Sequence, residues 1–254
     1  VNDVLDLKDA DCSIAMAAGS EAAQHVAQLV LLSSNFSAMP QIVKEGRRVI
    51  NNIERSATLF LVKNIFSFVV SLVLLFAAMP YPLVPAQISL LSGLLIGVPS
   101  FLLTFEPSYG RGSFMRSVLL NALPGGLVNV VNLLAVMWIG SGMGLPMEQI
   151  STVCTLLAGT AGFMVLLFLC WPLSRWRFAI VAAMGVGFIG ACVLLGPLFG
   201  LFPLSGRAWT LLGVFAAATP ALMCLFVFLV SRVKQRLRRS QRAKHAAGLS
   251  ATLS

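Results

Sequence analysis

The sequence predicts a mainly α-helical protein in which a six-helix transmembrane bundle follows a small and incomplete α/β segment. Composition gives the first reason, because 58% of the residues are hydrophobic and 11% are charged, whereas a soluble domain carries roughly 25% charged residues. The second reason is a set of six long apolar runs, since about 20 apolar residues cross the hydrocarbon core of a membrane. We expect the spans near residues 58–79, 82–105, 118–139, 150–172, 178–202 and 209–230.

The first 34 residues have the pattern of a helix, a strand, a second helix and a second strand. We expect a helix over 2–8, a short buried strand over 12–16, a helix over 20–28 capped by Ser20, and a strand over 29–32. This order is typical of a parallel α/β sheet, but the segment is too short to close a core and its strand edges would be unpaired. The predicted organisation is therefore the α/β segment (1–34), a connecting helix (35–57), six transmembrane helices (58–231) and a basic tail (232–254).

Positive charge is concentrated on one side of the predicted membrane. The net charge is +9, and in an apolar chain this excess bears on orientation and lipid contact. One side carries the basic residues Lys44, Arg47, Arg48, Arg55, Arg111, Arg116, Arg175, Arg177, Arg232, Lys234, Arg236, Arg238, Arg239, Arg242 and Lys244. The opposite short loops offer Glu148 and Arg207. Because positive loops are cytoplasmic, we expect a multi-pass protein of the cell (plasma) membrane with both termini in the cytoplasm.

A basic segment directly after a membrane helix is ordinary topology. We therefore expect membrane lipid as a partner of the tail, and no nucleic acid.

In the third span, the polar residues Asn121, Asn129 and Asn132 are predicted to tie helices together, as such side chains commonly do in membranes.

Residues 1–64 carry a series of short motifs in a fixed order. They are Val1-Asn2-Asp3, Leu7-Lys8-Asp9-Ala10-Asp11, Ser13-Ile14-Ala15-Met16, Gly19-Ser20-Glu21, Val30-Leu31-Leu32, Asn35-Phe36, Glu45-Gly46-Arg47-Arg48 and Asn51-Asn52-Ile53. In order and spacing they resemble P-type (E1-E2) cation-transporting ATPases, whose hinge motif Thr-Gly-Asp-Gly-x-Asn-Asp precedes an Ala-Leu-Lys-x-Ala-Asp run. The resemblance implies that residues 1–34 are the end of a HAD-like phosphorylation domain and that the spans are the last six helices of a pump.

The same resemblance implies catalytic roles for Asn2 and Asp3. In the family the Asn contacts the phosphoryl group and the final Asp supports the Mg²⁺ site, and phosphoryl transfer needs such groups. The first Asp of the motif and the Asp-Lys-Thr-Gly segment are not in this sequence. We therefore expect Mg²⁺ and ATP as cofactors of the full-length protein, the missing N-terminal part of the same pump as a partner, and no activity from this chain alone. On their own, Asn2 and Asp3 would be a helix N-cap.

Polar residues in the first two spans predict a transport path. Lys63, Ser67 and Ser71 are spaced by four and share one helical face, with Asn64 beside them. A Gly and a Pro two residues apart in the second span predict a break in that helix, and broken helices often mark transport sites; a packing kink is the alternative. The predicted path consists of Lys63, Asn64, Ser67, Gln87, Ser92, Gly97 and Pro99.

Short motifs in these two spans also resemble known pumps. Lys63-Asn64-Ile65 is similar to the Lys-Asn-Ile of the gastric proton–potassium pump, and lipid flippases carry a Lys-Asn pair there. Pro85-x-Gln87 and Gly97-x-Pro99 match the next helix of calcium pumps. However, Ser67 and Ile96 stand where cation pumps have carboxylates. A divalent cation prefers several hard, usually charged oxygens, so a calcium-type site is not favoured.

The combined features predict the C-terminal part of an ATP-driven P-type pump that translocates a cation through an aspartyl-phosphate intermediate. Two alternatives remain open: a flippase-like pump for a lipid or organic cation, and a non-catalytic membrane scaffold. The role of Lys63 is also open, because a buried lysine can act as a built-in cation or can snorkel to the interface as an anchor.

Overall fold

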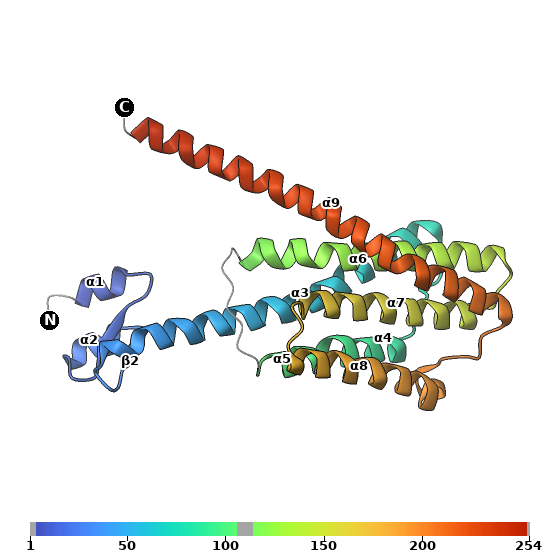
Figure 1. Cartoon of the computed structure of the whole chain (residues 1–254), viewed down its shortest axis with the longest axis horizontal. Coiled ribbons are helices and arrows are strands. Elements are labelled where there is room, and N and C mark those ends of the chain that lie inside the picture. The colour runs from blue at the N-terminus through green and yellow to red at the C-terminus, as the bar shows by residue number, and fades with distance from the viewer. Residues whose placement is uncertain (1–3, 106–113, 253–254) are drawn as a thin grey trace. The chain divides into compact units, whose positions relative to one another are not determined.

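The computed structural model describes residues 4–105 and 114–252, with side chains described in 4–105 and 117–235. The chain forms two compact units, Val1–Val49 and Ile50–Ser254, and the elements of both are drawn in Figure 1. Each unit is described here by itself.

The first unit contains the α/β segment. Its elements are α1 (Val4–Asp9), β1 (Ile14–Met16), α2 (Glu21–Val26), β2 (Leu29–Leu31) and η1 (Phe36–Ala38). The two strands pair in parallel with Ile14 opposite Leu29, and the hydroxyl of Ser20 accepts a hydrogen bond from the Ala23 amide at 3.3 Å. The predicted helix and strand order, the parallel pairing and the Ser20 cap are therefore confirmed. Among the described residues of this unit, the buried apolar side chains are Ala15 and Leu31, so the unit has very little core.

The second unit is the membrane bundle. Its elements are the C-terminal part of α3 (Met39–Ala77), α4 (Pro85–Ser92), η2 (Gly93–Gly97), α5 (Val98–Leu103), α6 (Phe114–Gly142), α7 (Met147–Leu169), α8 (Arg175–Leu194), η3 (Gly196–Phe199) and α9 (Gly206–Thr252). Six helical stretches in the described part of the chain are long and apolar enough to span a membrane. The predicted mainly α, six-helix bundle is thus confirmed. The connecting helix and the first span form one continuous helix, α3.

The fifth span is shorter than the sequence indicated. We expected it over residues 178–202, but α8 ends at Leu194 and is followed by the short helix η3. Pro197 has no amide hydrogen to continue an α-helix. Gly200 then adopts a left-handed conformation with φ of +65°, which glycine tolerates at no steric cost. The chain therefore turns here before α9 begins.

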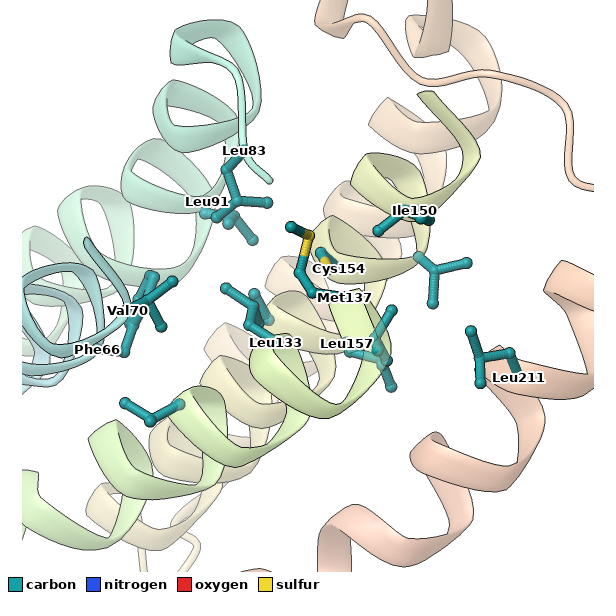
Figure 2. Packing of buried hydrophobic residues seen from close by; sticks show 14 of the residues in the cluster. Phe66, Val70, Leu83, Leu91, Leu133, Met137, Ile150, Cys154, Leu157 and Leu211 are labelled. Carbon is teal, nitrogen blue, oxygen red and sulfur yellow. The ribbon is translucent and has the colours of Figure 1, made fainter. Parts of the chain in front are cut away.

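Helix α7 supplies the centre of the bundle core. Its side chains Ile150, Cys154 and Leu157 pack in one cluster with Leu133 and Met137 of α6, as Figure 2 shows. Further members come from the neighbouring helices: Phe66 and Val70 of α3, Leu91 of α4 and Leu211 of α9. Lipid tails are as apolar as leucine, so the bundle depends on close packing rather than on a hydrophobic driving force between helices.

Glycines let α3, α6 and α7 approach each other closely. A methyl group added at Gly125 of α6 would lie 2.3 Å from Cγ2 of Val165 and 3.3 Å from Cγ2 of Val62. One added at the adjacent Gly126 would lie 2.6 Å from Cγ2 of Ile65. The stretch of α3 around Lys63 is therefore seated directly on the backbone of α6.

Candidate transport site

Polar side chains hold together one end of the bundle, which we call the short-loop end (residues 78–84, 143–146 and 195–205). Gln87 is fully buried at the start of α4. Its Nε2 donates to the Gly200 carbonyl at 3.0 Å, and its Oε1 accepts from the Val84 amide at 3.1 Å and from the Ser151 hydroxyl at 2.9 Å. All three hydrogen bonds are made to other groups of the protein. Gln87 therefore holds the start of α4 against α7 and against the loop before α9.

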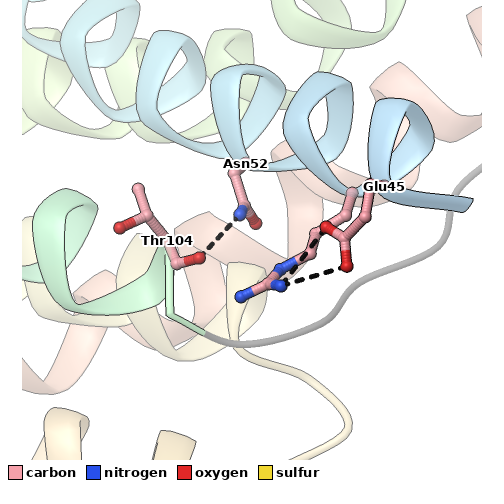
Figure 3. Close-up of polar contacts among 4 residues, drawn as sticks. Glu45, Asn52 and Thr104 are labelled. Atoms are coloured by element: carbon pink, nitrogen blue, oxygen red, sulfur yellow. Dashed lines mark hydrogen bonds and ion pairs between the residues drawn. The ribbon is translucent and has the colours of Figure 1, made fainter. Parts of the chain in front are cut away.

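A second set of contacts holds the opposite end, which we call the basic end (residues 50–55, 104–105, 117 and 170–177). Nδ2 of Asn52 on α3 donates to the Thr104 carbonyl after α5 at 3.0 Å, as Figure 3 shows. The hydroxyl of Ser117 bonds to the carboxylate of Glu54. The helix α4–η2–α5 is thus attached to its neighbours at both of its ends.

Between these two attachments the helix contains a turn of π-helix. In η2 the Val98 amide donates to the Gly93 carbonyl, five residues back, instead of four as in an α-helix. Pro99 follows and brings no amide hydrogen, so a carbonyl in the preceding turn lacks its usual donor. The expectation of a broken helix at Gly97 and Pro99 needs correction: the helix continues, and the irregularity is a π turn, a feature frequent at functional sites.

A small cavity lies beside this turn. Its volume is about 40 Å³. Three polar residues line it, Lys63 of α3, Ser92 of α4 and Asn129 of α6. The other lining residues are Leu59, Val62, Phe66, Ile88, Leu91, Leu95, Ile96, Ala158, Gly162 and Val165. The cavity therefore gathers groups from four helices around one lysine.

The hydrogen bonds of the two neutral polar residues are only partly complete. The Ser92 hydroxyl donates to the Ile88 carbonyl at 2.6 Å. Asn129 is 1% exposed; its Nδ2 donates to the Gly125 carbonyl at 3.1 Å, whereas its Oδ1 is buried without a hydrogen-bond partner among the described residues. Sequence reasoning assigned Asn129 to helix pairing and missed its place on this cavity. That pairing role belongs to Asn132, whose Nδ2 donates to the Thr219 hydroxyl of α9 at 2.9 Å.

The remaining residues of the predicted path are distributed differently. Asn64 is exposed and Ser67 is half-buried, and neither lines the cavity. The Ser67 hydroxyl accepts a hydrogen bond from Tyr81 at 3.4 Å, and burial raises the pKa of this tyrosine, which lies in the loop after α3. Gly97 ends the π turn and Pro99 is buried in α5. The cavity thus brings together Lys63 and Ser92 of the predicted set.

Acidic ligands are not part of this cavity. Its lining contains no Asp or Glu, and the described residues form no group of three or more His, Cys, Asp or Glu side chains that could hold a metal ion. The predicted catalytic residues Asn2 and Asp3 lie outside the described residues, so their roles stay predictions.

The comparisons with known proteins point to ion pumps. No family model matches the chain. The "Probable cation-transporting ATPase exp7" of Streptococcus pneumoniae serotype 4 is 37% identical over 203 residues, which are 76% of this chain and 26% of that protein. The "Calcium-transporting ATPase CtpE" of Mycobacterium bovis is 37% identical over 205 residues, 74% of this chain and 26% of that protein. The "P-type sodium-transporting ATPase4" of Toxoplasma gondii is 36% identical over 109 residues, 42% of this chain and 8% of that protein.

The chain spans about a quarter of the length of the first two relatives. Their similarity extends over about three quarters of this chain, and the described residues contain six helices that are long and apolar enough to span a membrane. The chain is therefore an integral membrane protein, and it belongs to the family of P-type cation-transporting ATPases.

Proposed function

We propose that the whole protein is an ATP-driven pump that moves a cation across the cell membrane through an aspartyl-phosphate intermediate, and that this chain supplies its membrane bundle. The observation that carries the proposal is the 37% identity to cation-transporting ATPases over 203 residues. ATP, Mg²⁺ and the phosphorylated carboxylate are assigned to the part of the pump that the relatives have beyond this match. Asn2 and Asp3 would complete that site, as the family resemblance implies.

Within the bundle, the cavity beside η2 is the proposed section of the cation path. It combines a lysine, a serine and an asparagine with a π turn, whose irregular backbone can present carbonyl oxygens at membrane depth. Both termini are proposed to face the cytoplasm, with the basic end on that side. The short-loop end would then face the exterior, and the basic tail (232–254) would contact lipid headgroups.

Reconstitution of the intact pump in proteoliposomes tests this function. ATP and Mg²⁺ are added on the outside, and hydrolysis and uptake are measured for Ca²⁺, Na⁺ and K⁺ separately. We expect one of these cations to stimulate hydrolysis, to accumulate, and to change the level of an acid-stable phosphoenzyme.

The lack of carboxylates in the cavity lining makes a second substrate class worth including in the same assay. Hydrolysis that no cation stimulates, together with ATP-dependent movement of a fluorescent phospholipid, would support the flippase-like alternative. An intact protein that neither hydrolyses ATP nor forms a phosphoenzyme under any of these conditions would support the scaffold alternative.

A further inference from the structure

The cavity beside η2 contains a buried hydrogen-bond acceptor for which the described residues offer no hydrogen. Oδ1 of Asn129 has no partner in the described part of the chain, although the side chain is 1% exposed. Nδ2 of the same amide is already used by the Gly125 carbonyl at 3.1 Å. Burying an acceptor without a donor costs free energy, so a donor is expected to reach this oxygen.

Among the residues that line the cavity, Lys63 has hydrogen-bond donors that are not already used. The Ser92 hydroxyl hydrogen is committed to the Ile88 carbonyl at 2.6 Å, and ten of the other lining residues are apolar. The ammonium of Lys63 carries three donors and no acceptor. No ion pair joins Lys63 to an acidic side chain of the described residues. The residue with unused donors and the residue with the unused acceptor therefore line the same cavity.

The packing places the two residues on adjacent helices at the same cavity. Val62 and Ile65, on either side of Lys63, lie against Gly125 and Gly126 of α6, and Asn129 follows Gly125 by one helical turn. The cavity volume of about 40 Å³ exceeds the roughly 10–15 Å³ that one water needs. A bridging water would fit where the contact is not direct.

The geometry points to Asn129 as a positioning residue for Lys63. Its Oδ1 accepts a hydrogen bond from the ammonium, directly or through one water, and so holds the positive charge inside the cavity instead of at the membrane surface. This inference deepens the proposed function and rests on it, because a positive charge held here would compete with a transported cation for the same few oxygens. The occupant of the cavity in this state is the lysine's own ammonium, and a second cation enters when the ammonium leaves.

A double-mutant cycle on the intact purified pump tests the contact. The melting temperature is measured in detergent, without nucleotide, for Asn129→Leu, Lys63→Met and the double variant. We expect Asn129→Leu to lower the melting temperature when Lys63 is present, and by less than a third of that shift in the Lys63→Met variant. Contacting residues are non-additive in this way, whereas distant ones are additive.

Asn132 provides a matched control on the same helix. Its Oδ1 is also buried without a described partner, but its amide pairs with Thr219 of α9. The Asn132→Leu shift should be the same with and without Lys63→Met. Equal shifts for Asn129→Leu in both backgrounds would overturn the inference.

A second variant covers the case in which Asn129→Leu does not fold. Asn129→Asp keeps the acceptor and adds a charge, so it should be tolerated beside Lys63 and strongly destabilising with Lys63→Met, which leaves a buried carboxylate unpaired. Equal tolerance in both backgrounds contradicts the contact. Because these measurements need no turnover, coupling without ATP-driven transport would refute the proposed function alone, and transport without coupling would refute this inference alone.

Discussion

At the scale of single residues, Lys63 lies on the face of α3 that lines the cavity, together with Val62 and Phe66. A lysine at the centre of a span costs about 2.5–3.5 kcal/mol on insertion scales. An anchor that snorkels needs only to reach the headgroups and gains nothing from a cavity. The built-in cation and the snorkelling anchor both stay hypotheses for Lys63, and substitution can distinguish them.

Substitution of Lys63 in the intact pump separates the two roles. We expect Lys63→Ala to uncouple or abolish turnover while the phosphoenzyme still forms, and we expect Lys63→Arg not to restore full transport. Steady-state ATP hydrolysis, transport and phosphoenzyme level are measured, with Ser71→Ala as the control because Ser71 is exposed on the same helix. Wild-type transport and hydrolysis in Lys63→Ala would end the built-in-cation hypothesis.

Gln87 is predicted to be a stability residue more than a transport residue. In Gln87→Leu the Gly200 carbonyl, the Val84 amide and the Ser151 hydroxyl lose their partner, and one buried unsatisfied group costs roughly 1–3 kcal/mol. We expect a clear fall in the melting temperature of the intact pump, with little change for Ser89→Ala, because Ser89 is exposed. An unchanged melting temperature for Gln87→Leu would contradict the structural role.

Spacing along one helix identified some of the cavity residues and not others. Lys63 and Ser92 were found because polar residues are conspicuous in apolar spans. Asn64 was also placed on the predicted transport path; it does not line this cavity, and its role in transport stays a prediction. Asn129 was missed because its environment depends on the register between α3 and α6. That register is set by side-chain contacts at Gly125 and Gly126, which no periodicity reveals.

At the scale of elements, the helix α4–η2–α5 shows what local sequence can and cannot specify. Gly97 and Pro99 correctly located an irregularity, because proline removes a donor wherever it occurs. They did not reveal its form. Whether the chain unwinds or closes a π turn depends on which amide reaches which carbonyl, and here the Val98 amide reaches Gly93.

The close packing of α3 on α6 predicts that Gly126 cannot be replaced by a larger residue without loss of stability. Gly126→Ala adds a methyl group 2.6 Å from Cγ2 of Ile65, and such overpacking costs about 1–3 kcal/mol. A methyl group added at Gly213 of α9 would meet no atom within 4 Å. Gly213→Ala should therefore leave the free energy of unfolding unchanged or raise it by up to about 1 kcal/mol. Thermal unfolding of the two intact variants measures the difference, and an unaffected Gly126→Ala variant would show that α3 and α6 are not in close contact.

At the scale of the whole molecule, the loops predict the orientation of the bundle. Glu148 is exposed in the first turn of α7, at the short-loop end. In a cysteine-free background, Glu148→Cys should react with a membrane-impermeant maleimide applied to intact cells, while Arg175→Cys should react only after the cells are opened. Labelling of Glu148→Cys from the cytoplasmic side alone would reverse the assignment.

The chain by itself is predicted to be inactive as an ATPase. Neither the nucleophilic Asp nor the Asp-Lys-Thr-Gly segment that the family resemblance requires is in its sequence. Mg²⁺-dependent phosphate release by the purified chain in detergent should therefore equal that of a buffer blank, with the intact pump as the positive control. Turnover above the blank, or an acid-stable phosphoenzyme on this chain, would show that the family motif is assigned wrongly.

The attachments of α4–η2–α5 at both ends have a mechanical consequence. Gln87 fixes one end and the Asn52 bond to Thr104 fixes the other. Both ends of the segment are therefore held by hydrogen bonds to other parts of the bundle. We expect a rotation of α5 to be taken up at the π turn, Gly93–Gly97, where the regular α-helical hydrogen bonding is interrupted. Because Leu95 and Ile96 of that turn line the cavity, we expect such a rotation to change the shape of the space around Lys63.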